Sequence, residues 1–275
     1  MGISLQQGWQ QLSDIPVLCL ELGQQHCVVS LYGSHVLRYF DGSCERLWLS
    51  DTATWTNAAA IRGGIPICWP WFGPYPQSQV TPATALPNHG LVRNRLWNLV
   101  GFDITESSVQ ATLAIVVSDI PWHHSNVTLR CHVTLNNEGL SVCLQSDQEL
   151  MQQAALHSYF SVTSLADASV SGLSSQYSDK VNQSQETAHH GQCRFIGEID
   201  RIYPNTADTL TLNTGTTWQL HQDGHDASVV WNPGEHKGSN AKDIQQQWPE
   251  FICVETAQLN WQPKGLKLTQ QIPKL

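Results

Sequence analysis

The chain has few charged residues, and those it has are mostly acidic. Only 13% of its 275 residues are charged, with 14 Lys and Arg against 23 Asp and Glu, which gives a formal net charge of −9. A chain of this charge repels nucleic acid and anionic lipid, so we expect neither as a partner. A phosphorylated ligand would need a few locally placed arginines to hold it.

Long apolar runs and paired cysteine motifs are also missing. No segment approaches the roughly 18 consecutive apolar residues of a membrane-spanning helix, although 41% of the residues are hydrophobic. The eight cysteines include no CxxC pair, and we interpret them as free thiols packed like small apolar side chains. Because residues 1–6 resemble neither a signal peptide nor a myristoylation site, we expect a cytoplasmic, reducing location.

Helical periodicity is nearly absent, and an alternation of apolar with polar residues takes its place. Such alternation is typical of half-buried strands, and it occurs over residues 17–22, 27–32, 109–117, 127–135, 140–145, 210–212 and 266–272. The sequence NNEG at 136–139 predicts one hairpin, and NTG at 213–215 predicts a second. Short helices are expected only near 51–56 and 241–247.

No internal repeat, low-complexity tract or charged linker divides the chain. We therefore predict one all-β domain over residues 1–275, a large antiparallel β-sandwich with few short helices. The polar segment 176–192 lacks a hydrophobic pattern, so we expect it to form a surface loop.

A tryptophan-rich segment, IRGGIPICWPWFGP at 61–74, is the first candidate for a functional site. Its glycines permit unusual backbone angles, and the rings of Trp69 and Trp71 offer the flat surfaces on which sugars stack. The same rings also suit an ordinary core, and residue type alone favours that interpretation. Arg62 in the same segment is harder to assign to a core.

A second candidate segment, NHGLVRNRLW at 88–97, combines His89 with two of the few arginines. An arginine fork binds phosphate through two parallel hydrogen bonds, which makes Arg93 a candidate ligand. Arg95 fits a solvated surface charge better, because charged side chains usually lie outside.

Two strand-like segments contain isolated ionisable residues. His157 in LHSYFSV (156–162) fits either a satisfied core histidine or a catalytic group. Glu255 in FICVETA (251–257) follows four apolar residues, and a buried carboxylate is costly unless it is paired or used. The segments DRIY (200–203) and VVWNPGE (229–235) are weaker signals. The doublets 123–124 and 189–190 lack partners at metal-ligand spacing, so we expect loop histidines and no metal site.

Taken in order, these six motifs between Arg62 and Ala257 closely resemble the hexose-6-phosphate epimerases of the aldose 1-epimerase (galactose mutarotase-like) superfamily. The resemblance implies a large β-sandwich, no cofactor, and exchange of the α and β anomers at C1 of a hexose 6-phosphate such as glucose 6-phosphate. It implies the following roles: His157 as general acid, Glu255 as general base, His89 and Asp200 as ligands of sugar hydroxyls, and Arg62 and Arg93 as phosphate ligands, with Arg95, Trp69 and Trp71 as weaker candidates.

Two alternatives stay open. A mutarotase for neutral aldoses would use the same acid and base without the arginines, and a sugar-phosphate-binding protein would bind without catalysis. A glycosidase fits less well, because that chemistry usually needs two carboxylates flanking one bond. A small-molecule hexose phosphate is the expected partner, and a monomer is the default expectation.

Overall fold

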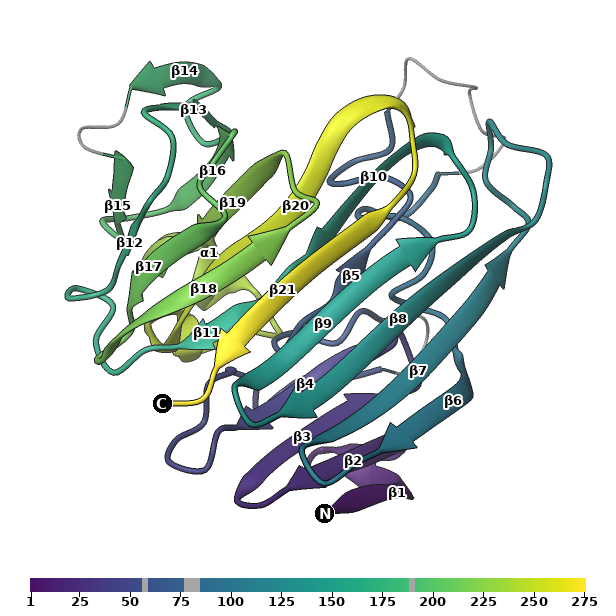
Figure 1. The fold of residues 1–275 in the computed structure, drawn as a ribbon. Helices are drawn as coiled ribbons and strands as arrows, with labels where there is room; N and C mark the ends of the chain where they lie inside the picture. Colours follow the sequence, from purple (N-terminus) through teal and green to yellow (C-terminus); the bar gives the residue numbers. More distant parts are fainter. Residues whose placement is uncertain (56–58, 77–84, 188–190) are drawn as a thin grey trace.

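The computed structural model describes residues 1–55, 59–76, 85–187 and 191–275, and strands dominate them (Figure 1). Within these residues the strands form three sheets, and every pair of named strands is antiparallel. The smallest sheet has the order β1-β2-β3-β4, with bounds β1 (Gly2–Trp9), β2 (Leu12–Leu22), β3 (Gln25–Ser30) and β4 (His35–Phe40). The predicted all-β class is confirmed.

The largest sheet has nine strands among the described residues and forms one layer of the molecule (Figure 1). Its order is β15 (Gln192–Arg194), β12 (Ser169–Ser171), β17 (Thr209–Asn213), β18 (Thr217–Asp223), β21 (Lys267–Pro273), β9 (Gly139–Ser146), β8 (Val127–Asn136), β7 (Ser108–Val117) and β6 (Asn98–Ile104).

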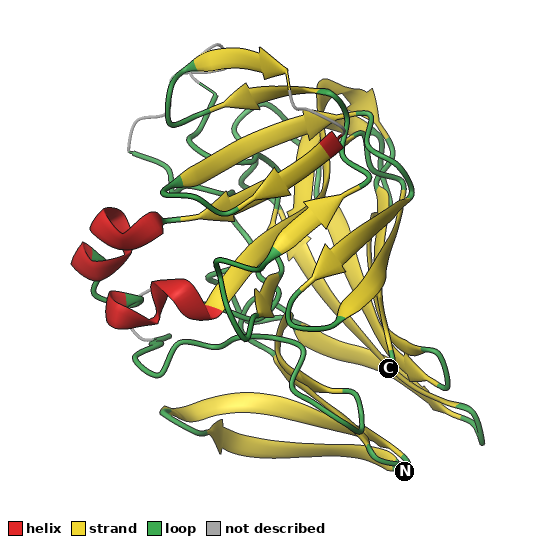
Figure 2. Cartoon of the chain, turned by 90° about the vertical axis from the view of Figure 1, so that its left-hand side faces the viewer, coloured by secondary structure: helices red, strands yellow, loops and turns green. Residues whose placement is uncertain are grey.

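The third sheet carries the candidate catalytic residues. Its order is β14 (Ser184–Thr187), β13 (Gln176–Asp179), β16 (Ile199–Pro204), β19 (Ala227–Asn232), β20 (Phe251–Lys264), β10 (Leu150–Leu156) and β5 (Ile67–Cys68), and β11 (Tyr159–Ser161) also pairs with β20. Two short helices, α1 (Gly234–Asn240) and the 3₁₀ helix η2 (Gln245–Glu250), connect β19 to β20 and project from the strands (Figure 2).

A continuous apolar core lies between the nine-stranded sheet and the other two sheets. β2 packs on β7 and β8, while β10 and β20 pack on β21. Alternation along β20 decides which side chains enter this core, because successive residues of a strand point to opposite faces. Ile252 and Val254 face the core, and Cys253 packs in a separate cluster on the other face. The odd-numbered positions from 251 to 257, Glu255 among them, therefore lie on the face turned away from the nine-stranded sheet.

Both predicted hairpins are confirmed. β8 and β9 turn between Asn136 and Gly139, where Asn136 Oδ1 accepts the N–H groups of Glu138 (2.8 Å) and Gly139 (3.0 Å). Gly139 has φ +141°, and a Cβ there would lie 2.2 Å from the carbonyl oxygen of Ile272, so this position requires glycine. β17 and β18 form the second hairpin through Asn213.

Three local expectations are wrong. The segment 176–192 contains β13 and β14 and begins β15, because Tyr177 and Asp179 alternate inward despite the polar composition. One helix is expected over 241–247, but the structure has two: α1, which ends at Asn240, and η2, which begins at Gln245 and overlaps the expected range only at 245–247. Residues 51–55 form no helix, since the Ser50 hydroxyl accepts the Thr52 N–H and closes a turn, and residue 56 lies outside the described residues.

The eight cysteines are all unpaired, as expected, and five are buried: Cys27, Cys68, Cys131, Cys193 and Cys253. Within the part of the chain that the structure describes, no helix is both long and apolar enough to cross a membrane.

Candidate functional site

His157 and Glu255 are far apart in sequence but face each other across two antiparallel strands. β10 pairs Leu156 with Thr256, and β11 resumes with Tyr159 opposite Cys253. The same register carried through the two intervening residues sets His157 opposite Glu255. Their Nε2 and Oε1 atoms are 3.4 Å apart, and the side chains are only 9% and 1% exposed. The third sheet thus places an imidazole and a carboxyl group within reach of one small ligand.

The buried pair has strongly perturbed ionisation. Burial, and then the negative charge of Asp200, raises the pKa of Glu255, while Arg93 opposes this shift. Burial lowers the pKa of His157, and the electrostatic interaction with the His89 ring and the positive charges of Arg93 and Arg62 add to this shift. These opposite shifts favour a single proton shared by the pair at neutral pH. Among the described residues, His157 Nδ1 and Glu255 Oε2 are buried and have no hydrogen-bond partner, which is costly and therefore unusual outside functional sites.

His89 stands beside this pair with its ring at 5.6 Å from that of His157. Its Nδ1 accepts the Gly73 N–H at 3.3 Å, which leaves the proton of a neutral ring on Nε2. Burial, with the charges of Arg93 and Arg62, lowers the pKa of His89 to about 3. The residue is therefore a neutral hydrogen-bond donor next to the pair.

Arg62 is connected to the pair by Tyr159, a residue that the sequence analysis did not single out. Arg62 donates to the Tyr159 hydroxyl at 2.9 Å, and its Nε donates to Asp243 at 2.9 Å. The Tyr159 ring stacks on the His157 ring at 5.0 Å with an interplanar angle of 6°. A tyrosine that directly follows HS in a buried strand was a usable signal, whereas nothing in the segment around Asp243 indicated its role.

The two arginines of the 88–97 segment have different surroundings. Arg93 is half-buried, and its Nε has no hydrogen-bond partner among the described residues. Its charge acts on His89, His157 and Glu255 alike. Arg95 instead makes a two-pronged ion pair with Asp119, at 2.8 and 2.5 Å, near the surface. The structure therefore brings Arg93 to the site and leaves Arg95 committed to another partner.

Asp200 joins the site from β16. It pairs with Trp231 on β19, which pairs with Cys253 on β20, so the three residues form a row across the sheet beside Glu255. Burial raises the pKa of Asp200, and nearby Glu198 and Asp179 add to the shift while Lys237 opposes it. The rings of Trp231 and His157 make a T-shaped contact at 6.1 Å, so the weak motif at 229–235 contributes a residue to the site.

The expectation that Trp69 and Trp71 offer stacking surfaces is wrong. Both side chains are fully buried, because they pack in the core between the sheets. Their indole N–H groups donate to Gln152 Oε1 and to the Pro87 carbonyl oxygen. The core interpretation of these rings is the one that the structure supports.

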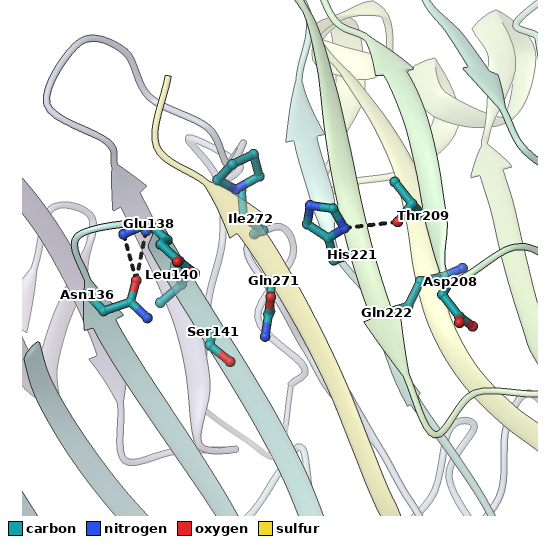
Figure 3. Close-up of a pocket in the computed structure, with 12 residues that line it drawn as sticks. Asn136, Glu138, Leu140, Ser141, Asp208, Thr209, His221, Gln222, Gln271 and Ile272 are labelled. Carbon is teal, nitrogen blue, oxygen red and sulfur yellow. Dashed lines mark hydrogen bonds between the residues drawn. The ribbon is translucent and has the colours of Figure 1, made fainter.

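The histidine doublet at 123–124 does not contribute to the site. His123 lies in a loop and contacts Gln148, and residues 189–190 lie outside the described residues. Within the described ranges, no group of three or more His, Cys, Asp or Glu side chains is arranged to hold a metal ion. A pocket of about 440 Å³ lies elsewhere, on the outer face of β9, β21 and β18, and contains none of the predicted site residues (Figure 3).

The fold is an antiparallel β-sandwich with a buried imidazole–carboxyl pair, and comparison with known proteins shows the family to which it belongs. The sequence model of the aldose 1-epimerase family matches residues 16–271. The chain belongs to the aldose 1-epimerase family, and it is a sugar epimerase, an enzyme of the isomerase class. The resemblance seen in the six sequence motifs is confirmed.

Individual relatives are similar to this chain over nearly its whole length. A curated protein of Escherichia coli (strain K12), named "Putative glucose-6-phosphate 1-epimerase", is 32% identical over 273 residues, which cover 96% of this chain and 89% of that protein. A Salmonella typhimurium protein of the same name is 32% identical over 256 residues, or 90% and 84% of the two chains. A Salmonella typhimurium crystal structure described as "a putative mutarotase" is 28% identical, with a TM-score of 0.85 over 99% of this chain and 97% of that one.

Proposed function

We propose that the protein interconverts the α and β anomers of a hexose 6-phosphate, with glucose 6-phosphate as the first candidate. The observation that carries this proposal is the register that sets His157 opposite Glu255, with two buried polar atoms of the pair left without a hydrogen-bond partner among the described residues. Such a pair suits a reaction that moves one proton onto a sugar and another off it. The names of the relatives from Escherichia coli and Salmonella typhimurium support the choice of substrate.

The chemistry needs one proton donor and one proton acceptor at the same sugar. Glu255 removes the proton of the C1 hydroxyl while His157 protonates the ring oxygen; the C1–O5 bond breaks and a C1 carbonyl forms. Rotation about C1–C2 and reclosure on the opposite face of the carbonyl give the other anomer and return both protons. Because burial favours protonated Glu255 beside neutral His157, the pair first passes its proton from Glu255 to His157, and Arg93 supports this transfer because its charge lowers the pKa of Glu255. His89 and Asp200 hold sugar hydroxyls in this arrangement.

Arg62 and Arg93 are the proposed phosphate ligands. Arg62 bonds to Tyr159, which stacks on His157, and the charges of both arginines lower the pKa of His157, so both act where the sugar would bind. Arg93 has an unpartnered Nε, and Arg62 is held in a fixed orientation by Tyr159 and Asp243. Arg62 already has Asp243 as an ion-pair partner, so a neutral aldose would leave the charge of Arg93 without a ligand, which disfavours the mutarotase alternative.

The test is to dissolve α-glucose 6-phosphate, add protein at low temperature, and follow the β anomer by NMR, with free glucose and galactose in parallel. We expect acceleration of the phosphate only, and a loss of about 10² to 10⁴ in kcat for Glu255→Gln. Equal turnover of the neutral sugars would refute the phosphate assignment. Tight binding of the phosphate without acceleration would favour the binding-protein alternative, and a fully active Glu255→Gln variant would refute the mechanism.

A further inference from the structure

A chain of buried polar side chains crosses the core directly behind the His157–Glu255 pair. We call it the inter-sheet polar network, and it consists of Ser158, Thr206, Gln222, Ser228, Thr256 and Gln270. Each of these side chains is at most 8% exposed. Polar groups in a core are costly unless their hydrogen bonds are satisfied, so a network of this size calls for a specific reason.

The register of the strands explains why the network lies where it does. Ser158 follows His157 and Thr256 follows Glu255, and neighbouring strand residues point to opposite faces of a sheet. Hence the two ionisable side chains lie on the outer face while the two hydroxyls point inward. Ser228 on β19 lies directly opposite Thr256 and extends the row of inward-pointing hydroxyls.

The nine-stranded sheet supplies the side chains that reach across. Gln270 on β21 is paired with Gln222 on β18, so the two amides stand side by side. The Ser158 hydroxyl donates to Gln270 Oε1, and Gln270 Nε2 donates to Thr256 Oγ1 at 2.8 Å. One amide thus joins the neighbours of both ionisable residues.

Beyond that amide, the hydrogen bonds continue to Gln222 and Ser228, and the Ser228 hydroxyl in turn donates to Gln222 Oε1 at 3.1 Å. The Thr256 hydroxyl donates to Gln222 Oε1 at 3.1 Å, and Gln222 Nε2 donates to Ser228 Oγ at 2.9 Å and to the Ala207 carbonyl oxygen at 3.0 Å. The two amides therefore use both their oxygen and their nitrogen atoms. A fully satisfied network of this kind fixes one arrangement of the strands that it connects.

The backbone at the site needs such support. Residues 157 and 158 interrupt the strand between β10 and β11, and the Ser158 N–H bonds to the Leu156 carbonyl oxygen instead of to β20. Across this gap, the Val254 N–H donating to the Ser158 carbonyl oxygen at 3.2 Å is the ladder bond that joins the two segments. The hydrogen bonds of Gln270 to Ser158 and Thr256 add a second connection between these segments, at the place where few backbone hydrogen bonds join them.

We propose that Gln270 is a positioning residue, which sets the separation of His157 and Glu255 by clamping Ser158 and Thr256 from the opposite sheet. This inference deepens the proposed acid–base function and rests on it. An active-site group displaced by about 1 Å can cost a hundredfold in rate, so loss of the clamp acts on kcat and leaves substrate binding nearly intact.

The experiment uses near-isosteric variants of the full chain. Gln270→Met and Thr256→Val remove the hydrogen bonds, whereas Thr256→Ser keeps the hydroxyl. We expect kcat for α-glucose 6-phosphate to fall about 10- to 100-fold in the first two variants, with KM within about twofold, and to recover in Thr256→Ser.

Gln25→Met is the matched control. Gln25 is another buried glutamine that ties two sheets together, since it accepts from the Tyr39 hydroxyl and donates to the Asn136 carbonyl oxygen. It lies far from the pair, on β3. A merely structural role for Gln270 predicts that both glutamine variants lose stability and that neither loses kcat once folded, and that result would overturn the proposal.

A second measurement separates this proposal from the proposed function. NMR titration of labelled histidine follows the His157 ring whether or not any sugar is turned over. We expect the His157 pKa to move toward its ordinary value in Gln270→Met, because a loosened pair admits water. If the wild-type protein accelerates no sugar, the proposed function fails while the titration still decides the clamp. An unchanged His157 titration in Gln270→Met would overturn the clamp.

Discussion

His35 offers a direct test of how burial controls ionisation around the site. Its side chain is buried, and its Nε2 lies 2.7 Å from the Gly63 carbonyl oxygen, the residue next to Arg62. Burial lowers the pKa of His35 to about 4, with the charge of Arg93 adding to the shift and the bond to Gly63 opposing it. Protonation of this ring would therefore place a charge beneath the segment that carries a proposed phosphate ligand.

The sign of the effect follows from which state binds the proton. An unfolded histidine titrates near pH 6.5 and the folded one near pH 4, so between these values only the unfolded chain is protonated at this position. The stability that His35 contributes is complete above pH 6.5 and is lost as the pH falls. The loss is about 1.4 kcal/mol per pH unit, or about 3 kcal/mol by pH 4.5.

The assay is urea unfolding followed by tryptophan fluorescence at several pH values from 7 to 4.5, for wild type and His35→Gln. Titration of the other groups is common to both proteins, so the difference between them isolates this residue. We expect the free energy of unfolding of the wild type to fall by about 3 kcal/mol relative to that of His35→Gln on acidification from pH 7 to pH 4.5. His236→Gln, at an exposed helical position, is the control. Parallel pH curves for wild type and His35→Gln would refute the reasoning.

Two other predictions concern backbone fit and charge. Gly90 has φ +87°, and a Cβ there would lie 1.9 Å from a backbone oxygen, so Gly90→Ala should cost at least about 2 kcal/mol in urea unfolding. Gly101→Ala, where nothing lies within 4 Å, should change stability by less than about 0.5 kcal/mol; similar losses in the two variants would contradict the steric argument. Arg93→Met should raise KM for glucose 6-phosphate at least about tenfold, while Arg95→Met should leave it within about twofold. Steady-state kinetics check this pair, and equal effects would argue against the proposed phosphate site.

The strands could be predicted well because their signal is local. Alternating apolar residues over 109–117 and 127–135 face the core in β7 and β8 as expected. Polar residues that fall at inward-facing positions of two other strands, β21 and β18, are a signal that the sequence analysis did not use. Gln270 stands in line with Leu268 and Ile272, and Gln222 in line with Leu220, so the same alternation already placed both glutamines in the core.

Other features depended on neighbours that lie far along the chain. Arg95 and Arg93 are two residues apart, yet one is committed to Asp119 and the other acts on Glu255. Trp69 and Trp71 carry the composition of a sugar platform but fill the core. Residue type alone does not distinguish a site arginine from a surface arginine, or a core tryptophan from a sugar-stacking one, because the tertiary packing determines which groups each side chain contacts.

By itself, the sequence determined the all-β class, the two hairpins and the presence of a costly carboxylate on an apolar strand, since each of these follows from alternation, turn chemistry or burial along one short segment. Only the tertiary structure decided that His157 stands opposite Glu255, that Tyr159 links Arg62 to this pair, and that Gln270 ties the strands behind it. The physical reason is that strand register joins residues about a hundred positions apart, and register is set by the packing of whole sheets.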